Sequence, residues 1–359
     1  MISHAPAAPY PLVNNEASLL DASDLVFVDA PGTGFGRITG KDKEKAFYGV
    51  DADAHAFAEF ITGFLSKYGR WNSPKYLFGE SYGTTRSAVL ANLLETDRSV
   101  DFNGVILLSQ ILAFDASGNQ PQDNPGIDLP YVVSLPTYAA TAWYHHKLPD
   151  APKDLPAFLD EVEHFATHDY ALALGDGAAL DPAERKTIVA KLHQYTGLPP
   201  DYIEKADLPG TTTGRLDTRF SGPSMDPLSK ESDYDPQSRR DQFGLCLRLQ
   251  RLCPQGSEIR RGQDLQSPEI ELWRKWDYRH QPPGEHAPLA QSANVMPRSG
   301  QRAENTTPTS RIMLNAGYFD LATPFYEGIY EMRQSADPGQ AAGQYRVQIL
   351  RIGPHGLCP

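Results

Sequence analysis

The sequence is poor in cysteine, in long apolar runs and in positive charge. Its three cysteines, Cys246, Cys253 and Cys358, are too few for a disulfide framework, and they lack the close spacing or histidine companions of a zinc site. No apolar run approaches the roughly 18 residues of a membrane span. The N-terminus, MISHAPAAPYPL, has no basic region followed by an apolar run, so we expect no signal peptide in this chain.

Acidic residues outnumber basic ones, with 45 Asp and Glu against 33 Lys and Arg and a net charge of −12 at pH 7. A protein that follows nucleic-acid phosphates needs the opposite sign, so nucleic acid is excluded as a partner. The glycine-rich segment Asp29–Gly36 lacks the G-x-G-x-x-G pattern of a dinucleotide loop. We therefore expect no cofactor, no metal and no membrane partner.

What the sequence does contain is an alternation of strand and helix patterns over 359 residues. Short apolar strands are predicted at Ser23–Asp29, Lys75–Phe78, Gly104–Leu108 and Arg311–Asn315. Apolar residues at helical spacing predict helices at 51–68, Thr84–Glu95 and Pro324–Arg333. This alternation is typical of an α/β fold with a mostly parallel, doubly wound sheet.

Between residues 131 and 270 the pattern changes to helical pieces rich in aromatic and acidic residues: Tyr138–His146, Leu155–Tyr170 and Pro182–Tyr195. We interpret this stretch as a helical insertion that lies over the core. The predicted organisation is therefore residues 1–130 as the first part of the core, 131–270 as the insertion or cap, and 271–359 as the C-terminal part of the core.

The segment Gly79-Glu80-Ser81-Tyr82-Gly83 matches G-x-S-x-G between a predicted strand and a predicted helix. In that context the turn is a nucleophile elbow, which places the serine in a strained backbone position beyond the strand end. The small residues Gly79 and Gly83 would permit the turn, and the Tyr82 N–H would face a developing oxyanion. The alternative is an ordinary glycine-rich turn between a strand and a helix.

A serine nucleophile needs a base, and in this fold the acid and the histidine follow the serine in that order. Asp320 follows a predicted buried strand at the same sheet edge, which suits the acid, although a solvated loop aspartate is the alternative. Of ten histidines, His355 alone follows Asp320. It lies in a tail rich in glycine and proline, where a mobile surface histidine is the competing interpretation.

Five segments spread over most of the chain resemble the serine carboxypeptidase family, particularly its bacterial members. They are Leu25–Arg37 (LVFVDAPGTGFGR), Tyr76–Ser87 (YLFGESYGTTRS), Leu135–His145 (LPTYAATAWYH), Gly214–Gly222 (GRLDTRFSG) and Leu314–Phe325 (LNAGYFDLATPF). The glutamate before the serine is more specific than the elbow, which esterases and lipases share. The resemblance implies an α/β-hydrolase fold, a serine-type carboxypeptidase acting on peptides with a free C-terminus, and an exported protein, either periplasmic or secreted.

Carried over residue by residue, the resemblance implies Ser81 as the nucleophile, Asp320 as the orienting acid and the Tyr82 N–H as an oxyanion donor. It also implies that Glu80 contacts the free C-terminal carboxylate of the substrate. Two carboxyl groups share a hydrogen bond only when one of them is protonated, so this recognition should work best in acid.

Two departures from the family bear on activity. The family has a Gly-Gly-Pro-Gly loop ahead of the Asp29 region that supplies a second oxyanion N–H, and we expect this chain to be truncated before it. The family's Gly-His-Met is replaced by the tail ILRIGPHGLCP. Codons for that tail, read one base later, give YYESGHMVYA, which restores the motif and makes His355 a neighbour of the true base.

Codons for Phe243–Gln266 can also be read one base later. The segment itself has scattered arginines, whereas the shifted reading has apolar residues at helical spacing. All three cysteines fall in these two segments. We therefore expect frame slips there and after Gln348. Two other functions stay open: another hydrolase of this fold, such as an esterase or aminopeptidase, and a non-catalytic fragment that only binds peptides.

Overall fold

The computed structural model describes residues 14–39, 41, 46–116, 126–205, 275–281, 311–335 and 345–350. The strands are β1 (Tyr76–Glu80), β2 (Gly104–Leu108), β3 (Arg311–Gly317) and β4 (Tyr345–Leu350). The longer helices are α2 (Val50–Tyr68), α3 (Tyr82–Asp97), α4 (Leu129–Tyr144), α5 (Leu155–Phe165), α7 (Pro182–Thr196) and α13 (Phe325–Ser335). The shorter helical pieces are η1 (Leu19–Asp21), η3 (Ala166–Tyr170), α6 (Ala171–Asp176), η4 (Gly177–Ala179) and α8 (Pro200–Lys205).

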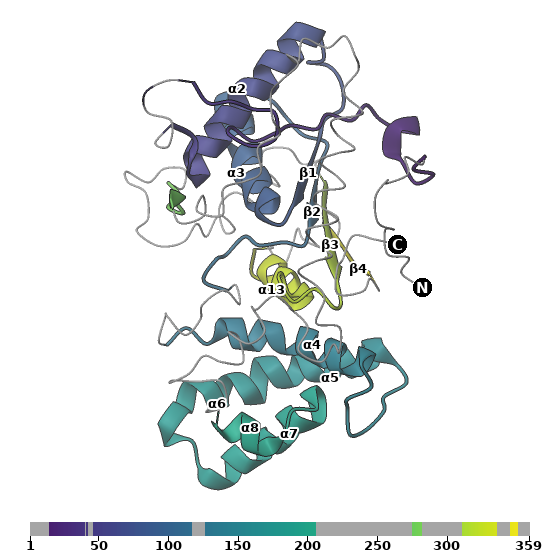
Figure 1. Cartoon of the computed structure of the whole chain (residues 1–359), viewed down its shortest axis with the longest axis vertical. Coiled ribbons are helices and arrows are strands. Elements are labelled where there is room, and N and C mark those ends of the chain that lie inside the picture. The colour runs from purple at the N-terminus through teal and green to yellow at the C-terminus, as the bar shows by residue number, and fades with distance from the viewer. Residues whose placement is uncertain are drawn as a thin grey trace.

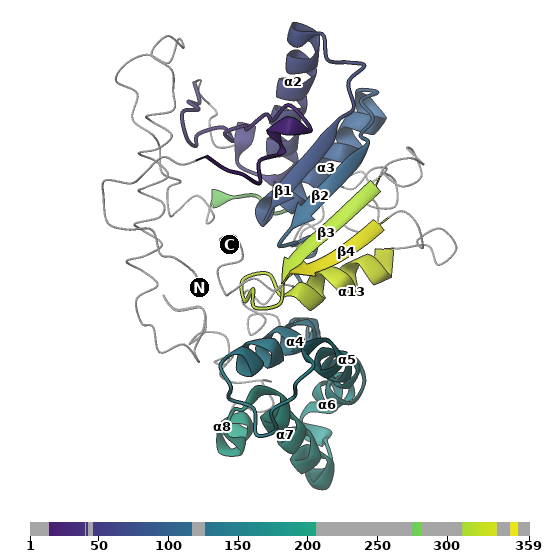
Figure 2. The same ribbon diagram turned by 90° about the vertical axis from the view of Figure 1, so that its right-hand side faces the viewer.

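The four described strands form one parallel sheet in the order β1-β2-β3-β4. Gly79 pairs with Leu107, and Leu107 pairs in turn with Leu314 on the other side, so β2 and β3 are central. All four strands therefore end at the same edge of the sheet (Figure 2). Parallel strands require crossover connections, and α3 supplies the one between β1 and β2. The predicted α/β class with a parallel sheet is confirmed.

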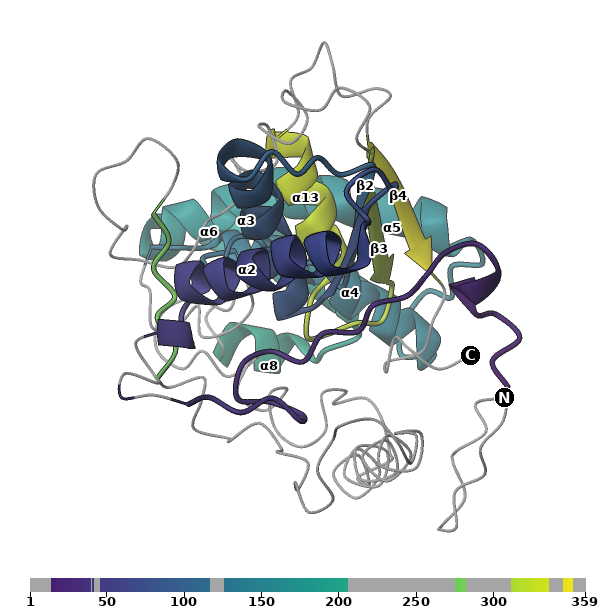
Figure 3. The ribbon, with the colours of Figure 1, turned by 90° about the horizontal axis from the view of Figure 1, so that it is seen from above.

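Helices α2, α3 and α13 lie on one face of the sheet (Figures 1 and 3). The helical spacing in α2 directs Ala54, Phe57, Ala58 and Leu65 into the core with β2 and β3. Asp51 and Asp53 occupy the first turn of α2, where the helix dipole favours negative charge. The helix ends at Gly69, which adopts a left-handed conformation.

An ion pair ties α2 to α3. The carboxylate of Asp53 accepts hydrogen bonds from Nε and Nη2 of Arg86 at 2.6 and 3.2 Å. Burial raises the pKa of Asp53, which is 1% exposed, although the guanidinium acts in the opposite direction. The guanidinium also lies over the rings of Phe57 and Tyr82. This pair fixes the start of the helix that follows the predicted elbow.

The helices of the described insertion, α4 to α8, pack around a second apolar cluster (Figure 1). Phe325 and Tyr326 of α13 belong to the same cluster, so the insertion is joined to the sheet layer through α13. Figure 2 shows α4 directly beneath α13, with α7 and α8 farther from the sheet. None of the described helices is both long enough and apolar enough to cross a bilayer.

The predicted strand at Ser23–Asp29 is wrong, because these residues have no regular secondary structure. A strand needs a neighbour for its backbone hydrogen bonds, and this segment pairs with none of the described strands. Its Phe27 side chain is 91% exposed. The short apolar run was present, but none of the described strands pairs with it.

Other predicted elements are confirmed with shifted ends. Helix α4 begins at Leu129, nine residues before the predicted start, and contains Pro136 in its interior. The predicted helix Leu155–Tyr170 is continuous in the chain but changes to π-helical geometry at Ala166. Strand β4 was not predicted. The segment Phe243–Gln266 and residues 351–359, including His355, lie outside the described residues.

Candidate active site

Ser81 occupies the turn between β1 and α3 in a strained conformation, with φ 52° and ψ −124°. A non-glycine residue at positive φ is uncommon and persists only where the surrounding structure imposes it. Here the Ser81 N–H donates to the carbonyl oxygen of Leu108 at 3.0 Å, and α3 begins at the next residue. The side chain is exposed at the sheet edge. This geometry is that of a nucleophile elbow.

The two glycines of the motif have different roles. A Cβ atom on Gly79 would strike the backbone carbonyl group of Gly83 and lie 2.6 Å from Oγ of Ser87. Strand β1 and helix α3 therefore approach so closely that only glycine fits at position 79. A Cβ on Gly83 would point into open space. The expectation that both positions require a small residue is confirmed for Gly79 and wrong for Gly83.

Tyr82 is the first residue of α3, so its N–H lies among the helix N-terminal donors that have no partner within the helix. The helix dipole adds positive potential at the same place. The Tyr82 ring packs edge-on against Trp276 at 5.1 Å, and burial raises the pKa of its hydroxyl. The backbone N–H can therefore serve an anion next to Ser81 while the side chain belongs to the core.

Asp320 lies in the loop between β3 and α13, at the sheet edge where β1 also ends. Its Oδ1 accepts from the backbone N–H groups of Ala322 and Thr323 at 3.0 and 3.2 Å. Its Oδ2 accepts from the hydroxyl groups of Ser109 and Thr323 at 2.7 and 2.9 Å. Four donors therefore fix the orientation of this half-buried carboxylate. A solvated loop aspartate would not have this set of donors.

Ser109 and two threonines are site residues that the sequence analysis missed. Ser109 follows β2 with φ 52°, so the ends of β1 and β2 are built alike. Thr84 and Thr85 donate to the carbonyl oxygen of Ile111, and the Ile111 N–H donates back to Thr84. These bonds hold the loop after β2 against the elbow helix. The polar Ser109-Gln110 pair, which interrupts an apolar run after a strand, was the available signal.

Glu80 and Asp320 are close enough to interact electrostatically. Burial raises the pKa of Glu80, and the negative charge of Asp320 raises it further. The structure thus brings the residue before the serine and the predicted acid to one place, although 240 positions separate them in the chain. A raised pKa keeps a carboxyl group protonated to higher pH, and only the protonated form donates a hydrogen bond to another carboxylate.

The third predicted member, His355, lies outside the described residues. None of the hydrogen bonds that Asp320 accepts from the described residues comes from a histidine. A different histidine and aspartate pair lies at the start of α2, where Nδ1 of His280 is 2.5 Å from Asp51. The Gln281 N–H donates to the same Asp51 carboxylate, so this pair joins residues 275–281 to α2.

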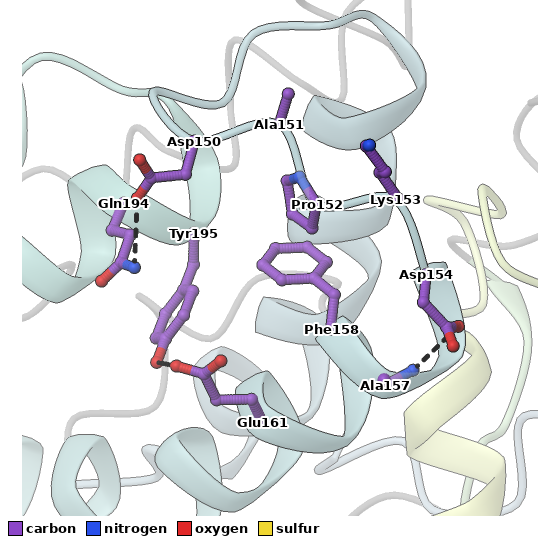
Figure 4. A pocket seen from close by; sticks show the side chains of 10 residues that line it. All are labelled: Asp150, Ala151, Pro152, Lys153, Asp154, Ala157, Phe158, Glu161, Gln194 and Tyr195. Atoms are coloured by element: carbon purple, nitrogen blue, oxygen red, sulfur yellow. Dashed lines mark hydrogen bonds between the residues drawn. The ribbon is translucent and has the colours of Figure 1, made fainter.

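A hollow of about 560 Å³ lies in the insertion, between α5, α7 and the segment before α5 (Figure 4). Tyr195 donates to Glu161 at 2.6 Å on one wall, and Gln194 donates to Asp150 at 3.5 Å on another. Phe158 lies beside Pro152 and faces Tyr195 (Figure 4). None of the lining residues belongs to the loops that follow β1, β2 or β3, so this hollow is separate from the candidate active site.

The fold and the elbow place the chain among α/β proteins with a parallel sheet and a serine at the end of a strand. The family model described as serine carboxypeptidase matches residues 5–127, a segment that contains the elbow. The predicted family resemblance is thus confirmed over this part of the chain, and the fold agrees with the α/β-hydrolase fold of that family. No curated protein matches the chain.

Proposed function

We propose that this protein is a serine-type carboxypeptidase that removes C-terminal residues from peptides through an acyl-enzyme on Ser81. The observation that carries the proposal is the convergence of the strained Ser81, the Tyr82 N–H, Glu80 and the oriented Asp320 at one edge of the sheet. The family match over residues 5–127 supports the same chemistry. An exported location, as in the family it resembles, is part of this proposal.

In the proposed reaction, Oγ of Ser81 attacks the carbonyl carbon of the last peptide bond, and its proton passes to a histidine base. His355 is our candidate for that base, which Asp320 would orient and stabilise once it is charged. The Tyr82 N–H faces the oxyanion. The base then returns the proton to the leaving amino acid, and a water molecule releases the peptide from Ser81.

Incubation of the whole chain with a synthetic peptide, in its free-acid and its C-terminally amidated form, tests the proposal. We expect single residues to be released from the free acid and more slowly from the amide, as followed by mass spectrometry. The Ser81→Ala variant should release none. Hydrolysis of simple esters without release of residues from either peptide would favour the esterase alternative. A parent chain with the same results as Ser81→Ala in every assay would favour the non-catalytic fragment.

The pH dependence of substrate affinity tests the proposed role of Glu80. The protonated carboxyl donates a hydrogen bond to the substrate carboxylate, and the burial and Asp320 charge that raise the pKa of Glu80 extend this form towards neutral pH. Above that pKa, KM for a free-acid peptide should rise by about tenfold per pH unit, because binding then requires uptake of one proton. KM for the amide should change less.

The Glu80→Gln variant is the matched control, because its amide donates at every pH. We expect a flat KM profile with turnover retained. Equal pH dependence for the acid and the amide, or a Glu80→Gln profile identical to that of the parent chain, would remove Glu80 as the group that recognises the carboxylate.

A further inference from the structure

Helix α13 carries a glutamate in its first turn that the proposed reaction does not use. Glu327 is 1% exposed, and neither of its carboxyl oxygens has a hydrogen-bond partner among the described residues. A buried carboxylate without a partner is very unfavourable, so the neutral acid is the form that such a site tolerates. The dipole of α13 favours the charged form at this position, but that effect is small beside the cost of burial.

A second buried glutamate lies one helical turn farther along. Glu331 is 2% exposed, and its carboxylate accepts from Nε2 of Gln110 and from the Ala113 N–H, both at 2.7 Å. These donors satisfy a negative charge on Glu331. At a spacing of four residues, Glu327 and Glu331 lie on the same side of α13. One of the two buried carboxyl groups is therefore provided with donors and the other is not.

Among the described residues, the two groups that act electrostatically on Glu327 are both acidic. They are Glu331 on the same helix and Asp320 in the loop before it, and both raise the pKa of Glu327 in addition to the large effect of burial. The nearest cation on α13, Arg333, faces Glu163 of α5 and the hydroxyl of Tyr326. No three acidic, histidine or cysteine side chains in the described part of the chain are arranged to bind a metal ion. Within the described part of the chain, a proton is therefore the remaining way to neutralise the pair.

We propose that Glu327 and Glu331 form a buried carboxyl pair that holds one proton and thereby positions the Asp320 loop against the loop after β2. Two sets of contacts connect the loop after β2 with the Asp320 loop and with α13, the helix that follows it. Glu331 binds Gln110 and Ala113, and the neighbouring Ser109 donates to Asp320. This role deepens the proposed function, on which it rests only through Asp320.

The proton matters because it limits the buried pair to one negative charge, which the donors to Glu331 satisfy. When the pair loses its proton, a second negative charge appears beneath the Asp320 loop in a buried environment. The helix and the loop must then separate or admit water to relieve it. We therefore expect both the stability of the fold and the reactivity of Ser81 to fall when the pair ionises.

The first measurement is urea unfolding of the whole chain at several pH values, for the parent and for Glu327→Gln. Burial raises the pKa of Glu331 to about 7 and that of Glu327 well above its ordinary value of 4.5. Between 4.5 and these native values the folded chain holds a proton that the unfolded chain has released, so stability falls as pH rises. The unfolding constant should rise by about tenfold per pH unit for each such proton.

Glu327→Gln keeps the shape of the protonated acid and cannot ionise. Its stability should therefore fall less steeply with pH than that of the parent, by a slope that corresponds to about one proton. Glu16→Gln, at an exposed glutamate, is the matched control and should follow the parent chain. The infrared carbonyl band of a protonated carboxylic acid should be present at neutral pH in the parent and lost in Glu327→Gln. This band also tests the proposal through Glu331→Gln if Glu327→Gln does not fold.

The second measurement is the rate at which a fluorophosphonate labels Ser81, followed against pH in the same variants. In Glu327→Gln we expect this rate to persist to higher pH than in the parent. An unchanged unfolding profile together with no loss of the infrared band would overturn the carboxyl pair, whether or not the chain hydrolyses peptides. Loss of the band with an unchanged labelling profile would overturn the positioning role alone. Absence of any labelling with the band intact would count against the proposed function and not against the pair.

Discussion

Replacing Asp320 with asparagine is expected to slow covalent labelling of Ser81 by about 10⁴-fold, the loss typical of removing the charge of a triad acid while keeping its shape. The asparagine amide fits the same loop, where Oδ1 still accepts from the Ala322 and Thr323 N–H groups. The hydroxyl groups of Ser109 and Thr323 can turn to accept from the new NH₂ group. The loss would therefore come from the missing charge rather than from a displaced loop.

Ser109→Ala provides the graded control for Asp320→Asn. It removes one of the four donors to Asp320 and leaves the charge in place, so we expect a loss on the order of tenfold. Labelling rates measured with a fluorophosphonate and assigned to Ser81 by peptide mapping check both variants. An Asp320→Asn rate within a few-fold of the parent chain would show that Asp320 is a structural residue of the loop and not the acid of a triad.

Gly79→Ala is expected to destabilise the fold by about 3 kcal/mol or more, at the upper end of the range for overpacked sites. The added methyl group would meet the backbone of Gly83 and Oγ of Ser87, and a backbone carbonyl cannot rotate away as a flexible side chain can. To make room, α3 must move away from β1, and the turn that imposes the strained conformation on Ser81 opens. Urea unfolding and Ser81 labelling should both report the loss.

Gly83→Ala is the matched control. The G-x-S-x-G motif requires glycine at both positions, whereas in the structure only Gly79 of the two lacks room for a side chain. Its methyl group enters open space, and alanine in a helix is more favourable than glycine by about 1 kcal/mol. We expect Gly83→Ala to be as stable as the parent chain or more stable. Similar destabilisation in both variants would contradict the close approach of β1 and α3 at Gly79.

The core elements were predictable because their apolar spacing is a local property of the chain. Helix α2 and strand β2 were predicted almost to their ends. An apolar repeat of 3.6 residues indicates a helix and a short apolar run indicates a strand, and both patterns can be recognised from neighbouring residues alone. The segment Ser23–Asp29 has equally good local signals and still fails to form a strand. Strand formation also depends on a partner, which no local pattern contains.

For the candidate site, the sequence determined which residues have the chemistry, namely a serine in an elbow motif, the glutamate before it and an aspartate after a later strand. Only the tertiary structure decided that Ser109 and Thr323 orient Asp320, and that the charge of Asp320 acts on Glu80. The burial of Glu327 and Glu331 in the helix after the Asp320 loop was likewise decided only by the tertiary structure. The reason is physical: hydrogen bonds, burial and charge interactions join residues up to 240 positions apart, so they depend on how the strands and helices pack.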